Sequence, residues 1–104
     1  MSLQRVIRGL FAEAQRTGKR AHQRLNSGLH LRAGIVVKEG RTFEVLHLTR
    51  PDHPKGPSTT EAHTCAKHAG WGERYGFRAD PQSQTISIWR EVKARRGGDR
   101  AAAV

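Results

Sequence analysis

The sequence predicts an α+β fold in which an antiparallel sheet of about four strands carries two helices on one face. Three observations lead to this prediction: an amphipathic helical pattern opens the chain, two strand-like segments follow it, and a capped helix precedes a second pair of strands. The predicted element order is therefore α-β-β-α-β-β. A chain of 104 residues has the size of one domain. We expect residues 1–90 to form this domain and residues 91–104 to be a polar C-terminal tail.

The first helix is predicted to run from the N-cap residue Ser2 to about Leu25. Its apolar residues recur at spacings of three and four and form one stripe, which consists of Leu3, Ile7, Leu10, Phe11, Ala14, Ala21 and Leu25. The opposite side carries the basic residues Arg5, Arg8, Arg16, Lys19, Arg20 and Arg24. Gly18 lies inside the apolar stripe and marks either a close approach to the sheet or a break after Thr17.

Residues 29–48 are predicted to form a β-hairpin. Apolar residues occupy alternate positions from Leu29 to Val37, which is the period of one strand face. Gly40 can adopt a positive φ, so a tight turn is expected at Glu39-Gly40. The alternation shifts by one residue between Val45 and Leu46, which predicts a β-bulge there. Helices or further strands must cover this hairpin, because a lone hairpin is only marginally stable.

A second helix and a second hairpin are predicted after the hairpin. Prolines 51, 54 and 57 define a stiff loop. The sequence Ser58-Thr59-Thr60-Glu61 is a capping box and begins a helix that ends near Ala69. Segments 75–79 and 84–90 then form the second hairpin. Ile86 and Ile88 share one face of its last strand, and Trp89 lies on the other face.

The charge of the chain points to a polyanionic partner. Basic residues outnumber acidic residues by 19 to 9, and the net charge is +10. Phosphate backbones are the first partner expected for such an excess, and anionic membrane surfaces are the second. No membrane partner is expected, because the hairpin needs the apolar face of the first helix. A solvated, merely solubilising helix surface is the alternative. We expect a nucleic acid, DNA or RNA, bound mainly through its phosphates by Arg5, Arg8, Arg16, Lys19, Arg20, Arg24, Arg32, Lys38 and Arg41, with Trp89 stacking on a base.

A separate anion site is predicted where the second helix begins. Here a glycine-containing loop delivers a helix N-terminus, where free amides and the helix dipole favour an anion. The residues expected to contribute are Lys55, Ser58, Thr59 and Thr60. The spacing is not that of a P-loop, and an ordinary capped helix start is the alternative interpretation.

No cofactor, metal site or catalytic group is expected. His63 and His68 are five positions apart, about 140° around a helix, and the chain has no CxxC motif. Cys65 is expected to be buried and therefore not a nucleophile. Pro51-Asp52 and Glu91-Val92-Lys93 contain the pieces of a PD-(D/E)xK nuclease motif, but a whole predicted helix separates them. We therefore favour a non-enzymatic protein over a metal-dependent nuclease.

The sequence also allows a protein partner in place of a nucleic acid, and it indicates a location for the protein. The exposed strand face or an open sheet edge could instead pair with a second copy or with another chain, as in a protein–protein interaction module or a homo-oligomer. No apolar run approaches the roughly 20 residues that span a membrane, and the single cysteine fits a reducing cytoplasm. The predicted order also lacks the GxxG loop of a KH domain, the aromatic strand motif of an RNA-recognition motif and the βββ meander of a double-stranded-RNA binder.

Overall fold

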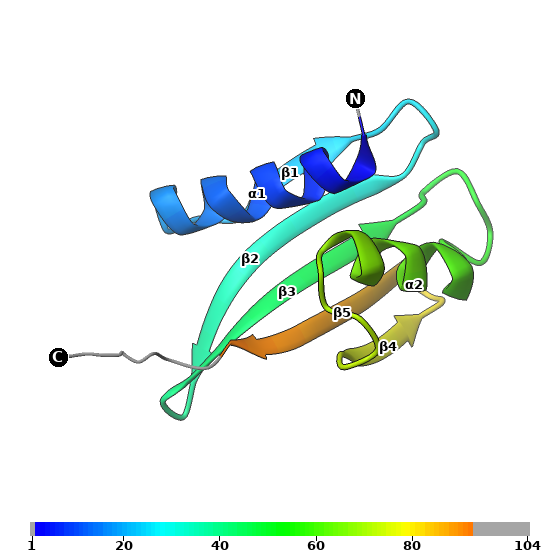
Figure 1. The fold of residues 1–104 in the computed structure, drawn as a ribbon. Helices are drawn as coiled ribbons and strands as arrows, with labels where there is room; N and C mark the ends of the chain where they lie inside the picture. Colours follow the sequence, from blue (N-terminus) through cyan, green and yellow to red (C-terminus); the bar gives the residue numbers. More distant parts are fainter. Residues whose placement is uncertain (1, 93–104) are drawn as a thin grey trace, which may run out of the picture.

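In a computed structural model of the chain, we describe residues 2–92, which form two helices and five strands (Figure 1). In chain order the elements are α1 (Leu3–Thr17), β1 (Ala21–Arg24), β2 (His30–Lys38), β3 (Arg41–Thr49), α2 (Thr59–His68), β4 (Gly76–Asp80) and β5 (Thr85–Val92). No helix in this part of the chain is long and apolar enough to cross a membrane. The predicted domain boundary at residue 90 is too early, since Glu91 and Val92 belong to β5. The rest of the predicted tail, residues 93–104, lies outside the described residues.

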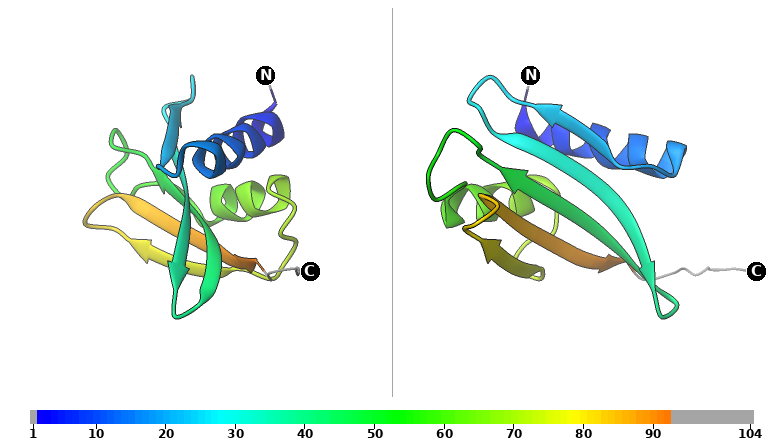
Figure 2. Two further views of the ribbon diagram at one scale, coloured as in Figure 1. Left: turned by 90° about the vertical axis from the view of Figure 1, so that its left-hand side faces the viewer. Right: turned by 180° about the vertical axis from the view of Figure 1, so that it is seen from behind.

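The strands form one antiparallel sheet in the order β1-β2-β3-β5-β4. Both helices lie on the same side of this sheet, and no described element covers its other side (Figure 2). Helix α1 packs against β1 and β2, and α2 packs against α1 and β5. The predicted α+β class with helices on one face is confirmed, with five strands instead of about four.

The core lies between the helices and the sheet. Its largest fully buried side chains are Ile7, Leu31, Leu46, Leu48, Cys65 and Ile88. Because strand residues alternate between the two faces, these inward-facing positions fix which residues point away from the helices. The predicted inner residues Ile35 and Val37 are exceptions, with 38% and 69% of their surface exposed, because the far end of the β2–β3 hairpin extends beyond the core.

The first helix is shorter than the sequence predicted. It ends at Thr17, where Gly18 adopts a φ of 73° and donates its N–H to the Ala14 carbonyl. The chain then reverses, and residues 21–24 pair with β2 instead of continuing the helix. Ala21 and Leu25 matched the helical pattern because both contact the core, Ala21 from β1 and Leu25 from the turn that follows it. The extra strand creates a β1-β2-β3 meander that the sequence analysis did not find.

The β2–β3 hairpin has the predicted turn but not the predicted bulge. Glu39 and Gly40 have φ values of 53° and 74°, as a tight two-residue hairpin turn requires. The register is unbroken from Lys38 opposite Arg41 to His30 opposite Thr49. Phe43 and Val45 simply lie on the face away from the helices, so apolar residues on both faces produced the apparent shift.

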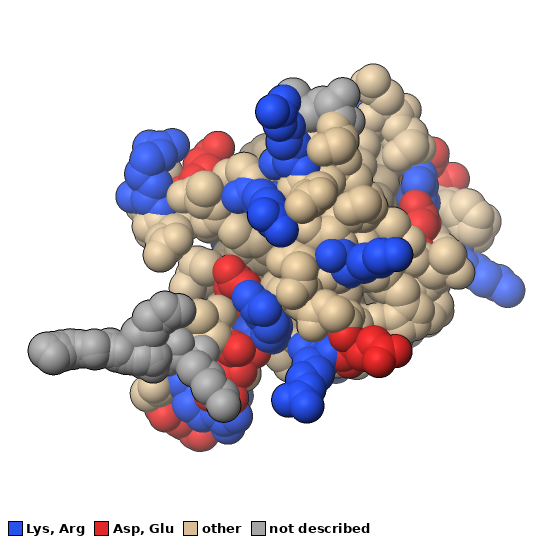
Figure 3. All heavy atoms as spheres, in the orientation of Figure 1, with Lys and Arg blue, Asp and Glu red and all other residues tan. Residues whose placement is uncertain are grey.

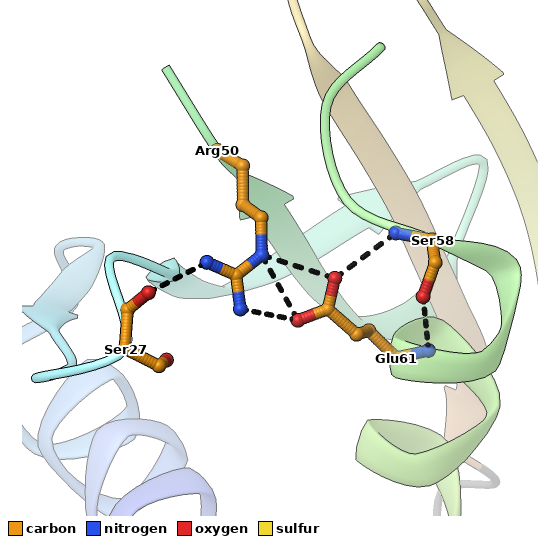
Figure 4. Close-up of polar contacts among 4 residues, drawn as sticks. All are labelled: Ser27, Arg50, Ser58 and Glu61. Atoms are coloured by element: carbon orange, nitrogen blue, oxygen red, sulfur yellow. Dashed lines mark hydrogen bonds and ion pairs between the residues drawn. The ribbon is translucent and has the colours of Figure 1, made fainter. Parts of the chain in front are cut away.

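The capping box predicted at Ser58 is present and is part of a larger contact (Figure 4). The Ser58 hydroxyl accepts from the Glu61 amide, and the Glu61 carboxylate accepts from the Ser58 amide at 3.0 Å. The same carboxylate accepts bidentate hydrogen bonds from Nε and Nη2 of Arg50. The Nη1 atom of Arg50 donates to the Ser27 carbonyl at 2.7 Å. Arg50 therefore joins the end of β3 to the β1–β2 turn and to the start of α2.

Candidate nucleic-acid interface

The side of the sheet that faces away from the helices, which we call the open sheet face, gathers cationic side chains from β1, β2, β3 and β4. Its positions follow from the strand register, since they alternate with the buried residues. The basic residues on it are Arg24, Arg32, Lys38, Arg41 and Arg78, and the histidines are His22, His30 and His47. The acidic residues on it are Asp80 and Glu91, and Arg41 binds Glu91 with a closest N–O distance of 2.5 Å.

One row of paired positions crosses the whole open sheet face. The register places His22 beside Arg32, Arg32 beside His47, His47 beside Ser87, and Ser87 beside Arg78. Side chains directly opposite one another on an antiparallel sheet have Cβ atoms roughly 5 Å apart. The row therefore forms a continuous polar band without an acidic side chain.

Arg20 joins this band from the segment between α1 and β1. A Cβ atom placed on Gly34 would lie 3.2 Å from Cγ of Arg20, so the arginine stem lies over the glycine on the open sheet face. The absence of a side chain at residue 34 leaves room for this arrangement. Arg20 thus faces away from the helix layer to which the sequence analysis had assigned it.

A hollow of about 340 Å³ opens in the band between β1, β2 and β3. Three histidines and two arginines line it together with polar neighbours; the lining includes His22, Arg24, His30, Arg32, His47 and Thr49. The His47 Nδ1 atom is hydrogen-bonded to Ser87 Oγ at 2.7 Å, which fixes the ring. Burial lowers the pKa of His47, and the charges of Arg20 and Arg32 lower it further.

Trp89 lies on the open sheet face, as the sequence predicted, next to this band. Its indole atoms Cε2, Nε1 and Cζ2 lie 2.1–2.5 Å from where a Cβ of Gly76 would stand, so the ring covers the backbone of β4. The other aromatic residues are placed differently. Trp71 is buried against Phe11, with ring centroids 5.9 Å apart, whereas Phe77 is 40% exposed.

The basic residues predicted for a single helix face are divided between two sides of the molecule. Arg5, Arg8 and Arg16 remain on the exposed side of α1. Lys19 lies in the connection after the helix, while Arg20 and Arg24 belong to the open sheet face. Figure 3 looks onto the helix side and shows Lys and Arg separated by uncharged surface, several of them beside Asp or Glu. The predicted continuous helix patch is therefore wrong, because α1 ends before half of its members.

The anion site predicted at the start of α2 already contains a carboxylate of the chain itself. Glu61 accepts from the Ser58 amide and from Arg50, and its pKa is lowered mainly by the hydrogen bond from Arg50 (Figure 4). Ser58 uses its hydroxyl to cap the helix. Lys55, Thr59 and Thr60 are exposed nearby. The ordinary capped helix start accounts for the geometry of these residues.

The structure separates the residues of the nuclease-like motif and groups no set of metal ligands among residues 2–92. No group of three or more His, Cys, Asp or Glu side chains within residues 2–92 could hold a metal ion. Asp52 follows the end of β3, whereas Glu91 pairs with Phe43 at the other end of that strand, which is about 20 Å away. Lys93 lies outside the described residues. Cys65 is buried, and burial raises the pKa of its thiol to about 12.

Sequence reasoning missed the histidines and Arg78 as members of the interface. The signal was present in the alternation of His22 with Arg24 and of His30 with Arg32, which places each pair on one strand face. It could be used only after residues 21–24 were known to be a strand.

Comparisons of the chain with models of known protein families, with curated proteins and with solved structures find no match.

Proposed function

We propose that this protein binds single-stranded nucleic acid on the open sheet face, through phosphate contacts and one stacked base. The observation that supports this most directly is the acid-poor cationic band across the uncovered side of the sheet. In the described part of the chain, Arg20, Arg24, Arg32, Lys38 and Arg78 form no ion pair with an acidic side chain. Five unpaired cations on one face suit a chain of phosphates.

Trp89 favours a single strand over a duplex. An aromatic ring on the face of a sheet can stack on a base only when that base is unpaired, and such stacking contributes about 1–3 kcal/mol per base. The Trp89 indole lies beside the band. Trp89 pairs with Gly76, two residues along the strands from the pair formed by Ser87 and Arg78. A strand whose phosphates follow the arginines would therefore bring a base over Trp89.

The test is fluorescence anisotropy with single- and double-stranded RNA and DNA at several salt concentrations. If all five unpaired cations contact phosphates, the logarithm of the affinity for a single strand should fall with a slope of about −3.5 against log salt. This slope corresponds to a loss of about 100-fold between 50 and 200 mM salt. A slope near zero, or no binding at low salt, contradicts the proposal.

A pair of matched variants distinguishes the open sheet face from the helix side. Arg32→Gln removes an exposed arginine from the band, and Arg8→Gln removes an exposed arginine from α1. Arg32→Gln should weaken binding and make the salt slope shallower by about 0.7, whereas Arg8→Gln should change neither. If Arg8→Gln weakens binding more, or if only duplexes bind, the ligand uses the helix side and the proposed interface is wrong.

The second candidate function is pairing with another copy of the chain through the free edge of β2. Strand β1 begins with Ala21 opposite Ala33, so residues 34–38 of β2 pair with β3 on one side and with no strand of residues 2–92 on the other. Ile35, Val36 and Val37 are exposed there by 38%, 38% and 69%. An exposed apolar edge of this kind can pair with another chain. Sedimentation equilibrium should then show a dimer that Val37→Lys disrupts, and a wild-type monomer at high concentration would exclude this function.

A further inference from the structure

The hollow between β1, β2 and β3 is more specialised than a cationic patch, because imidazole rings line it beside the guanidinium groups. His22, His30 and His47 contribute these rings. Arginine stays charged at any physiological pH, whereas histidine changes its charge near neutrality.

His47 is the histidine whose surroundings are most clearly defined. From β2 it faces Arg32 and, diagonally, His30; from β5 it faces Ser87. The remaining charged or titratable groups at the hollow are His22 and Arg24 on β1, and Arg20 acts on His47 from the segment before β1. None of the residues that line the hollow is acidic. The ring is thus about half-buried among cations.

These surroundings lower the pKa of His47 in the free protein and so favour the neutral ring. Partial burial lowers its pKa, and repulsion from Arg20 and Arg32 adds to the effect. An anion in the hollow reverses the repulsion, because its charge offsets the charges of Arg20 and Arg32 and attracts a protonated ring. An opposite charge within about 4–6 Å raises the pKa of a histidine by roughly 1–3 units. Occupation by an anion therefore favours the imidazolium form.

We propose that this hollow is the phosphate-binding part of the interface, and that a backbone phosphate of a single-stranded nucleic acid binds there against His47 and Arg32, near the charge of Arg20, with uptake of a proton by His47. This inference rests on the function proposed above. It assigns the hollow to a phosphodiester group and makes binding stronger as the pH falls. The hydrogen bond to Ser87 leaves the His47 Nε2 atom as the one that faces the ligand.

The experiment uses a single-stranded oligouridylate with free 5′ and 3′ hydroxyl groups, since neither its bases nor its phosphodiesters titrate between pH 5.5 and 7.5. Isothermal titration calorimetry at pH 6.5 in buffers of different ionisation enthalpy measures the protons taken up on binding. We expect net proton uptake, and an affinity that rises by up to about tenfold per pH unit for each proton taken up. His47→Gln should reduce the uptake, whereas the loop variant His53→Gln should leave it unchanged.

The wild-type protein provides a second measurement in case His47→Gln fails to fold. The His47 ring resonances followed by NMR as a function of pH should titrate at a higher pH with oligouridylate than without it. Binding without proton uptake, uptake that His47→Gln leaves unchanged, or a His47 titration that the ligand does not raise would overturn the inference and leave the proposed function standing. Absence of oligouridylate binding at low salt would overturn both.

Discussion

The contact between Arg50 and Glu61 allows a direct test of how the loop after β3 is held in place. Glu61→Gln keeps the shape of the side chain and an oxygen that can accept from the Ser58 amide, but it removes the negative charge. Arg50 and Glu61 have 18% and 28% of their side-chain surface exposed, so solvent screens the pair only in part. Charge-assisted hydrogen bonds are worth about 1.5–3 kcal/mol when well shielded, and partial exposure reduces this to about 1 kcal/mol.

The assay is thermal unfolding followed by circular dichroism at several pH values. A loss of about 1 kcal/mol lowers the Tm of a domain of this size by about 4–8 °C. The pKa of Glu61 is lowered in the folded protein, mainly by the hydrogen bond from Arg50, so its stabilisation is present above the unfolded pKa of about 4.3 and is lost as the pH falls through the folded pKa. The difference between wild type and Glu61→Gln should therefore be full at pH 7 and shrink toward pH 3.

The control for this experiment is Glu73→Gln, which changes an exposed glutamate away from this contact. A double-mutant cycle with Arg50→Gln then isolates the coupling between the two side chains. Equal Tm values for Glu61→Gln and Glu73→Gln, or a difference from wild type that persists unchanged at pH 3, would refute the reasoning.

Three further outcomes follow from the packing. Gly76→Ala should displace the Trp89 indole, lower the Tm and shift the fluorescence of this tryptophan, because the new methyl group would overlap the ring; an unchanged emission spectrum would contradict this. Leu46→Ala should destabilise the fold by about 2–5 kcal/mol in urea titrations, since the side chain is fully buried, and a loss below about 1 kcal/mol would be incompatible with that burial. Cys65 should resist a thiol reagent at pH 8 in the native protein and react promptly in urea, because burial raises its pKa to about 12; fast native labelling would argue against the position of α2.

Local patterns in the sequence were sufficient for most of the elements. The capping box at Ser58, the Glu39-Gly40 turn and the alternation of Ile86 with Ile88 are each set by neighbouring residues, and the structure confirms all three. The proline loop before α2 is likewise found where the sequence places it. Such signals are readable in advance because they depend on the backbone preferences of a few consecutive residues.

The end of α1 shows where local reasoning failed. Gly18 offered two interpretations, and both a longer helix and a break after Thr17 satisfied the local pattern. The choice depends on Ala21 pairing with Ala33, twelve residues further along the chain. One wrong boundary removed a strand from the sheet, hid the β1-β2-β3 meander and assigned Arg20 and Arg24 to the wrong side of the molecule.

The sequence by itself determined the fold class, the excess of positive charge and the outward position of Trp89, because composition and short periodic patterns carry these properties. Only the tertiary structure decided which cations share a surface, since Arg20, Arg32 and Arg78 come from separate segments. Hydrogen bonding between strands brought them together, and the register of that pairing selects the face on which every side chain stands. A shift of one residue in that register would have turned the same arginines toward the helices.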